Sequence, residues 1–235
     1  VLRIQNIQAT FNPEARRSVL LCAHWDTRPV ADMDSVNTEN PIEGANDGGS
    51  GTAMLLEIAR LIKSSPPDVG IEMIFFDAED YGVPKGKVDN SKGATSYCLG
   101  SQYWAKRWDP NKYLAEYGIL LDMVGAKGAI FKREKHSMEF AGHIVDRVWS
   151  EAASLGYGSI FVNQPTGYVM DDHVFVNQYA GIPCIDIIEF DSSDPDGAFG
   201  RYWHTHADNM DIISKKTLKA VGQTVVNVLY KEVDL

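Results

Sequence analysis

The sequence predicts a single α/β domain, a three-layer α/β/α arrangement with a mixed, mostly parallel central sheet. Short apolar runs alternate along the chain with longer segments of helical periodicity, the pattern typical of βαβ units. The chain has 235 residues, the length of one such domain, and no internal repeat, low-complexity tract or long linker divides it. We therefore expect residues 1–235 to form one domain.

The first half of the chain predicts a sheet with an edge strand and two buried strands. The buried strands are almost entirely apolar, as strands covered on both faces are. The helix between them has apolar residues at helical spacing and ends at Ser64-Ser65-Pro66-Pro67. Loops rich in Asp, Asn, Gly or Pro separate these elements. In chain order we predict a strand over 1–10, a strand over 18–24, a loop over 26–46, a helix over 50–63, a strand over 71–77 and a loop over 81–95.

The second half predicts further helices and strands in alternation. The first helix ends before Pro110, and the last carries its apolar residues on one face. In chain order we predict a helix over 96–108, a buried strand over 117–124, an amphipathic helix over 137–155, a short helix over 171–179, a strand over 182–190 and a helix over 215–233.

Composition excludes several classes of protein. The hydrophobic fraction of 44% and the charged fraction of 23% are ordinary for a soluble globular domain. The net charge of −10, without a basic cluster, argues against a nucleic-acid partner. The sequence contains no run of about 18 apolar residues, so it does not predict a membrane span. The cysteines, Cys22, Cys98 and Cys184, are odd in number and widely separated, so we expect buried thiols and neither metal ligands nor a disulfide.

Two adjacent carboxylates, Glu79 and Asp80, follow the predicted strand over 71–77. The carboxyl ends of parallel strands are where α/β proteins bind ligands. Buried charge without a partner costs several kcal/mol, so a cation or a reacting proton is expected there. One carboxylate can bind a metal while its neighbour transfers a proton.

Other histidines and carboxylates also lie at predicted strand ends or in the adjoining loops. Each has a structural explanation when taken alone: His24 as a satisfied histidine, Asp47 as a helix cap, and Asp122 as the partner of a buried base. Together they predict a metal site, and histidine with carboxylate and no cysteine suits catalytic zinc. Asp26 is expected to hydrogen-bond His24 and to set its tautomer. The converging residues are His24, Asp47, Glu79, Asp80, Asp122 and His204. His206 is the second choice for the position of His204. His136 and His143 are expected to lie on the surface or to pack against neighbours.

Short motifs containing these residues follow one another along the chain. In kind and order they resemble the motifs of the zinc aminopeptidase-like exopeptidase superfamily, over nearly the whole chain. They are His24-Trp25-Asp26, Asn46-Asp47-Gly48-Gly49-Ser50-Gly51, Asp77-Ala78-Glu79-Asp80, Leu121-Asp122-Met123 and Trp203-His204-Thr205.

The resemblance implies a catalytic domain with a role for each of these residues. Asp47 would be the central ligand, Asp80 and His204 would complete one zinc site, and Glu79 would be the general acid/base. His24 and Asp122 would complete a second metal site with Asp47. The superfamily usually has residues before the first strand, and this chain starts at Val1 without Met, so we expect it to lack some N-terminal residues.

Within that superfamily, four features are similar to glutaminyl cyclases of animals and their bacterial relatives. They are the segment Leu99 to Trp104, the doubled aspartate Asp171-Asp172 before His173, Trp203 directly before His204, and Phe199 four residues before Trp203. Two features depart from the animal enzymes. Asp80 stands where those enzymes have Glu, and the tryptophan that they carry after the acidic pair is absent.

Cyclase chemistry would use these residues to convert an N-terminal glutamine to pyroglutamate with release of ammonia. Glu79 would transfer the proton, zinc would polarise the γ-carbonyl, and one zinc per chain is expected, with a second possible. Asp171 and Asp122 would form a hydrogen-bonded acidic cluster, and Trp203 and Phe199 would wall the pocket, although both aromatics also suit core packing. The expected partners are peptides with N-terminal glutamine, at the cell envelope or outside the cell.

Two other functions stay open. A zinc aminopeptidase would use Glu79 to activate a metal-bound water, with Asp122 as a ligand of a second metal. A binding domain without catalysis would keep the fold, but such domains typically lose ligands and none is missing here.

Overall fold

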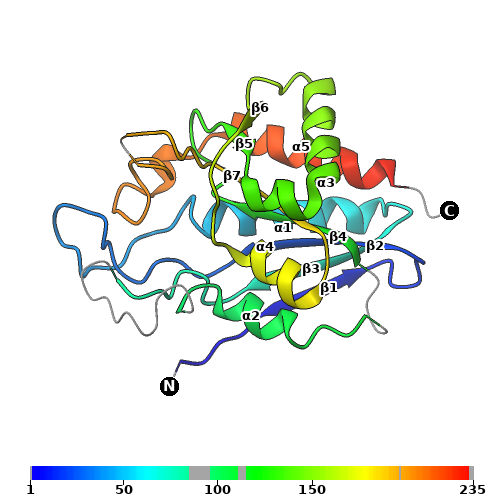
Figure 1. Cartoon of the computed structure of the whole chain (residues 1–235), viewed down its shortest axis with the longest axis horizontal. Coiled ribbons are helices and arrows are strands. Elements are labelled where there is room, and N and C mark those ends of the chain that lie inside the picture. Colours follow the sequence, from blue (N-terminus) through cyan, green and yellow to red (C-terminus); the bar gives the residue numbers. More distant parts are fainter. Residues whose placement is uncertain (1, 85–95, 111–114, 196, 233–235) are drawn as a thin grey trace.

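The computed structural model describes residues 2–84, 96–110, 115–195 and 197–232, and its centre is a mixed sheet with helices on both faces (Figure 1). Strand β1 at one edge is antiparallel to β3, and every other pairing in this sheet is parallel. The predicted mixed, mostly parallel sheet is therefore confirmed. Its order is β1 (Ile7–Phe11), β3 (Gly70–Phe76), β2 (Ser18–His24), β4 (Ala115–Asp122) and β7 (Cys184–Ile188).

Alternate residues of the buried strands pack against two different layers of helices. In β2, Val19 and Leu21 join one hydrophobic cluster, whereas Leu20 and Cys22 join another on the opposite face. The first layer consists of α1 (Gly49–Ser64), α3 (Lys135–Ser154) and α5 (Lys215–Lys231). The second consists of α2 (Leu99–Ala105) and the π-helix η2 (Val176–Ala180), together with α4 (Asp172–Phe175), which contacts both of them. Strands covered on both faces explain why their sequences are continuous apolar runs.

The predicted boundaries hold best where a run is buried, and they fail at the margins. β1 starts at Ile7 and not at residue 1, and the Gln5 N–H donates to Asp77 Oδ2 at 2.7 Å instead of joining the ladder. The helix predicted over 96–108 starts only at Leu99, because Cys98 is left-handed with φ 54°. The helix predicted over 171–179 is divided into α4 and η2. Residues 85–95 of the predicted loop lie outside the described residues.

Three short elements have no counterpart in the sequence prediction. β5 (Phe131–Arg133) and β6 (Phe161–Pro165) form a separate two-stranded parallel sheet, and η3 (Met210–Ile212) is a 3-10 turn. Elements of three to five residues are too short for hydrophobic periodicity to appear. In the described part of the chain no helix is long and apolar enough to cross a membrane. The three cysteines are buried and free, as predicted.

Gly51 lets helix α1 approach strand β4 closely, and we expect its replacement by alanine to destabilise the fold. A Cβ atom at Gly51 would lie 2.1 Å from the carbonyl oxygen of Leu121. Because the obstacle is backbone, relief requires the helix to move, at a cost of about 1–3 kcal/mol or more in the free energy of unfolding. The measurement is urea unfolding of Gly51→Ala. Gly142→Ala in α3 is the control, since the nearest atom there is the Met138 Cε at 3.6 Å, and it should cost nothing measurable.

Candidate active site

The predicted histidines and carboxylates converge at the carboxyl edge of the sheet. His24 is the last residue of β2, Asp122 is the last residue of β4, and Asp80 follows β3 by a short turn. Asp47 lies two residues before α1, and His204 comes from the loop after β7. All five side chains are buried. This edge is where an α/β sheet binds its ligands.

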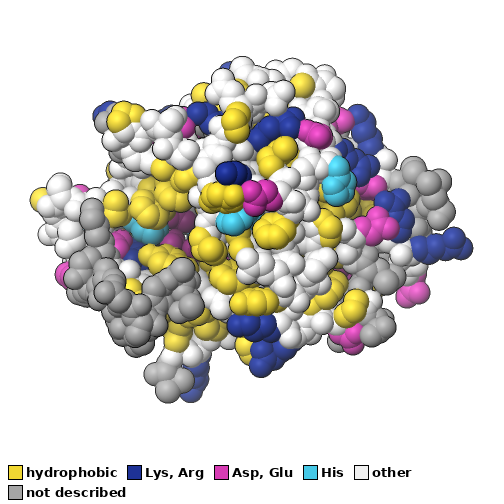
Figure 2. All heavy atoms as spheres, viewed as in Figure 1, with side chains coloured by type: hydrophobic (Ala, Val, Ile, Leu, Met, Phe, Trp, Pro, Cys, Tyr) yellow, Lys and Arg dark blue, Asp and Glu magenta, His cyan; other side chains and the backbone are white. Residues whose placement is uncertain are grey.

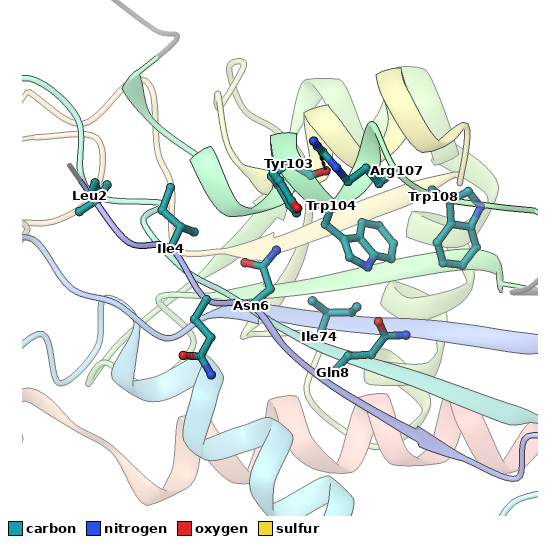
Figure 3. Close-up of a pocket in the computed structure, with 10 residues that line it drawn as sticks. Leu2, Ile4, Asn6, Gln8, Ile74, Tyr103, Trp104, Arg107 and Trp108 are labelled. Carbon is teal, nitrogen blue, oxygen red and sulfur yellow. Dashed lines mark hydrogen bonds between the residues drawn. The ribbon is translucent and has the colours of Figure 1, made fainter.

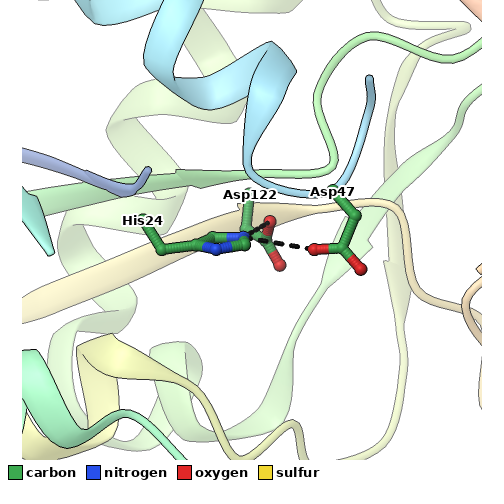
Figure 4. Close-up of side chains that lie close together, drawn as sticks. All are labelled: His24, Asp47 and Asp122. Carbon is green, nitrogen blue, oxygen red and sulfur yellow. Dashed lines mark hydrogen bonds and ion pairs between the residues drawn. The ribbon is translucent and has the colours of Figure 1, made fainter. Parts of the chain in front are cut away.

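Asp47 stands between the two histidines and faces each with a different oxygen. Its Oδ1 is 3.2 Å from His24 Nε2, which also lies 3.0 Å from Asp122 Oδ1 (Figure 4). Its Oδ2 is 3.5 Å from His204 Nε2, which lies 3.0 Å from Asp80 Oδ1. The structure thus brings together two sets of three residues that share Asp47 and that could each hold a metal ion.

These two sets fit a zinc ion by chemistry and by spacing. Tetrahedral zinc with bonds of about 2.0–2.1 Å places its ligand atoms roughly 3.3 Å apart. The distances of 3.0 to 3.5 Å from the histidine nitrogens to the carboxylate oxygens match that spacing. Asp47 Oδ2 and Asp80 Oδ2 are buried without a hydrogen-bond partner, and both belong to the set that contains His204. A cation would satisfy these oxygens.

The site contains more carboxylate charge than its histidines balance. Burial and the neighbouring charge of Asp80 raise the pKa of Asp47 to about 8. Burial opposes ionisation of Asp80 as well, but its hydrogen bond with His204 lowers the pKa of Asp80 to about 2. Burial and the charges of Asp80 and Asp171 raise the pKa of Glu79 well above its usual range. A bound cation would offset this excess of negative charge.

Carboxylates on neighbouring loops hold the ligand segments in place. Asp26 lies near His24, but its Oδ1 is 3.6 Å from Nδ1, too long for the predicted hydrogen bond. It accepts instead from the backbone N–H groups of Glu79 at 3.0 Å and Asp80 at 3.1 Å. Asp208, which no sequence motif indicated, accepts from the backbone N–H of Asp47 at 3.0 Å. The expectation for Asp26 was therefore wrong in its hydrogen-bond partner and right in its location.

Three residues at the site have left-handed backbone conformations, which are uncommon outside glycine. They are Ala78 before Glu79, with φ 57°, Met123 after Asp122, with φ 47°, and His204 itself, with φ 55°. Such conformations cost about 1–3 kcal/mol each and persist where the surrounding structure enforces them. The fold therefore holds these segments in strained positions that bring their side chains together.

Glu79 has a ligand atom within 4.8 Å of those of His24 and Asp80, and it also faces a second group of side chains. Its Oε1 accepts from the Cys98 thiol at 3.0 Å, a contact that the sequence did not predict. Donor atoms of Glu79, Cys98 and Asp171 lie within 4.8 Å of one another. Burial and the charge of Asp122 raise the pKa of Asp171 to about 6. Two carboxyl groups with raised pKa values thus lie beside the ligand sets.

Asp171 is the N-cap of helix α4 and belongs to a buried polar segment. Its Oδ1 accepts from the Asp172 N–H at 2.5 Å, while its Oδ2 has no hydrogen-bond partner. The predicted hydrogen bond between Asp171 and Asp122 is therefore not formed, although their charges interact and both line one cavity. The helix-capping contact occupies one oxygen and leaves the other available. His173, two residues after Asp171, is also buried, and its Nε2 lies 3.3 Å from Glu134 Oε2.

A cavity of about 70 Å³ opens beside these carboxylates. Trp203 and Phe199 form part of its wall, with their rings stacked at 4.7 Å, and Trp203 also stacks on the His204 ring at 3.7 Å. Both aromatic residues also pack against a hydrophobic cluster, so they line the cavity and contribute to packing at the same time. Tyr97 is a further wall residue, one that sequence reasoning missed. Figure 2 shows histidine and acidic side chains in a hollow bordered by hydrophobic ones.

The remaining predicted histidines lie outside this site. His206 is exposed and pairs through Nδ1 with Asp34 at 2.9 Å. His136 is half-buried against Phe140, and His143 is exposed on α3. The preference for His204 over His206 agrees with this geometry.

A larger cavity of about 630 Å³ lies between the N-terminal segment, β3 and α2 (Figure 3). Its walls carry the aromatic rings of Tyr103, Trp104 and Trp108, the amide of Asn6 and the guanidinium of Arg107. Its described lining residues include no carboxylate or imidazole. The chemistry therefore points to the smaller cavity.

Comparison with known proteins shows a match to one protein family and similarity both to glutaminyl cyclases and to peptidases. Residues 6–229 match the sequence model of peptidase family M28. A solved glutaminyl cyclase from Tannerella forsythia is 50% identical over 98% of this chain and 79% of its own, with a TM-score of 0.93. A solved Zn-dependent exopeptidase from Parabacteroides distasonis has the same identity, coverage and TM-score.

Curated relatives are more distant. The aminopeptidase YwaD of Bacillus subtilis is 30% identical over 224 residues, which cover 92% of this chain and 41% of that protein. The chain spans between 41% and 62% of the length of the first curated relatives that it matches.

Proposed function

The chain belongs to peptidase family M28, and within that family we propose that it converts the N-terminal glutamine of peptides to pyroglutamate, releasing ammonia. One observation carries the proposal: a second buried carboxyl group, Asp171, faces the same small aromatic-walled cavity as Glu79. Hydrolysis at a zinc centre needs one acid/base. A cyclisation gains from a second polar group that orients the glutamine amide in an enclosed pocket. The 50% identity with a bacterial glutaminyl cyclase supports this choice.

The reaction joins two atoms of one residue. The α-amine nitrogen of the glutamine attacks its own γ-carbonyl carbon, a C–N bond forms, and the bond from that carbon to the amide nitrogen breaks. Because nucleophile and electrophile share one residue, holding the side chain in a bent conformation supplies much of the rate enhancement. Trp203 and Phe199 are suited to enforce that conformation, because they narrow the cavity from one side.

Glu79 is the proposed proton carrier. It accepts a proton from the attacking amine and returns it to the amide nitrogen, which leaves as ammonia. Its burial and its raised pKa suit a group that must both take and give a proton. The Cys98 thiol contacts Oε1, so the carboxylate is held from one side and its other oxygen is left for the substrate.

Asp171 and Asp122 are proposed to orient the substrate. Asp171 Oδ2 is buried without a partner and can accept a hydrogen bond from a substrate N–H. Asp122 lines the same cavity, and its charge is one cause of the raised pKa of Asp171.

We propose one zinc ion per chain, held by Asp47, Asp80 and His204. Each set has a histidine–carboxylate contact of 3.0 Å, but the buried oxygens without a hydrogen-bond partner, Oδ2 of Asp47 and Oδ2 of Asp80, both belong to residues of this set. When bound, zinc supplies a Lewis acid that polarises the γ-carbonyl and stabilises negative charge on its oxygen.

A zinc aminopeptidase is the second candidate, and the shared position of Asp47 favours it. With His24 and Asp122 as further ligands, the same residues would hold two metals, as expected for an aminopeptidase with a two-metal site. The 30% identity with an aminopeptidase supports this alternative.

Paired assays on one zinc-quantified sample distinguish the candidates. We expect the protein to release ammonia from a peptide that begins with glutamine and to leave a leucine arylamide intact. The same peptide with an acetylated N-terminus is the control, because without a free amine it cannot cyclise. Ammonia release from the acetylated peptide would indicate a simple amidase. Cleavage of the arylamide with two zinc ions per chain would indicate the peptidase.

A further inference from the structure

Arg28 is a fully buried charged side chain that the proposed chemistry does not use. It lies in the loop after β2, with 0% of its surface exposed. Its Nε and Nη2 donate to the two carboxylate oxygens of Asp32 at 3.0 and 2.6 Å. A buried guanidinium is stable only when its charge and its N–H groups are matched, and this bidentate pair matches the charge.

The Arg28–Asp32 pair leads to His204. Asp32 Oδ1, the oxygen that accepts from Arg28 Nε, is 3.5 Å from His204 Nδ1. The other ring nitrogen of His204, Nε2, faces Asp47 and Asp80. A carboxylate beside the far nitrogen of a metal-binding histidine orients the ring toward the metal. Asp32 can do so only while Arg28 holds its carboxylate in this orientation.

The same guanidinium also reaches the segment that carries Asp80. Arg28 Nη1 donates to the backbone carbonyl of Asp80 at 2.7 Å and to that of Gly82 at 2.9 Å. Its guanidinium carbon lies 5.6 Å from the centre of the Tyr97 ring, a wall of the small cavity. A Cβ atom on Gly82 would lie 1.9 Å from that ring, so a side chain there would displace Tyr97.

We propose that Arg28 is the positioning residue of the Asp80–His204 half of the metal site, acting through Asp32 on His204 and through the backbone on Asp80. The inference rests on the zinc site of the proposed function. A planar fork is needed to bind a carboxylate and two carbonyls at once. Lysine keeps the charge but offers a single nitrogen on a flexible stem, so it cannot replace arginine here.

The test is zinc affinity, measured by competition with a chromophoric chelator and without substrate. We expect Arg28→Lys and Asp32→Asn each to weaken zinc binding by about 10-fold to 100-fold, the range for residues that orient metal ligands. Arg60→Lys is the matched control, since Arg60 makes a similar bidentate pair with Glu57 on the exposed face of α1. Its zinc affinity should equal that of the wild type.

Thermal unfolding of the metal-free proteins separates positioning from support of the fold. If Arg28→Lys lowers the melting temperature but binds zinc as tightly as the wild type, the inference is overturned. If Arg28→Lys does not fold, the zinc affinity of Asp32→Asn is the test. That substitution keeps the shape of the side chain and the hydrogen bonds from Arg28 to Asp80 and Gly82. Zinc binding by Asp32→Asn as tight as in the wild type also overturns the inference. The inference is also overturned if the wild-type protein binds no zinc. A wild type that binds zinc but does not cyclise glutamine contradicts only the proposed reaction.

Discussion

Replacing Glu79 with glutamine is expected to lower kcat/KM for cyclisation by about 100-fold to 10,000-fold, the range for loss of a general acid/base. Glutamine keeps the shape of the side chain and an oxygen that can accept from the Cys98 thiol. It cannot take a proton from the attacking amine. The zinc content should not change, because Glu79 lies beside the set Asp47, Asp80 and His204 and is not a member of it. The measurements are steady-state kinetics on a glutamine peptide and zinc quantified in the same sample.

Glu72→Gln is the matched control for this substitution. Glu72 is also buried on β3, and its Oε2 accepts from Gln8 and Thr10, residues of the edge strand. We expect wild-type kinetics from this variant. Full activity of Glu79→Gln would exclude Glu79 as the proton carrier. Loss of zinc from Glu79→Gln would instead assign it to the metal.

The buried strands and the residues at their ends follow directly from the sequence. A run such as 18–24 is apolar because both of its faces are covered, and it stops at His24 because the sheet edge opens toward the site. Asp122 and Asp80 can be recognised for the same reason, since Asp122 directly follows the apolar residues 119–121 and Asp80 comes four residues after the run that ends at Phe76. Short elements such as β5 and η3 depend on tertiary contacts and leave no periodic pattern.

The residues that hold the site in position could not be read from sequence. Asp208 is 161 positions from Asp47, whose N–H group it binds, and no local pattern links the two. Asp32 and Arg28 lie in a loop where Asp, Asn and Pro are common for reasons of turn formation alone. Cys98 was correctly predicted to be buried, but its contact with Glu79 depends on a left-handed backbone that only the structure reveals.

Replacing Asp171 with asparagine is expected to lower kcat for cyclisation by roughly 100-fold, as for other positioned hydrogen-bond partners in catalysis. The Asp172 N–H donates a hydrogen bond to Oδ1 at 2.5 Å in the wild type, so in the variant the amide oxygen of asparagine would take the place of Oδ1. That contact turns the amide NH₂ toward the position of Oδ2, which is unpartnered in the wild type. A donor would then face the substrate N–H where an acceptor is needed. Steady-state kinetics on the glutamine peptide measures the effect.

The cap of α4 makes this substitution a test of chemistry rather than of folding. Asparagine is as good an N-cap as aspartate, so Asp171→Asn should unfold at the same urea concentration as the wild type. Asp171→Ala loses the cap as well and should be less stable by about 1 kcal/mol. If both variants cyclised glutamine at the wild-type rate, the second carboxyl group would have no part in the reaction. Cyclisation would then need Glu79 for proton transfer and no hydrogen bond from the substrate to Asp171.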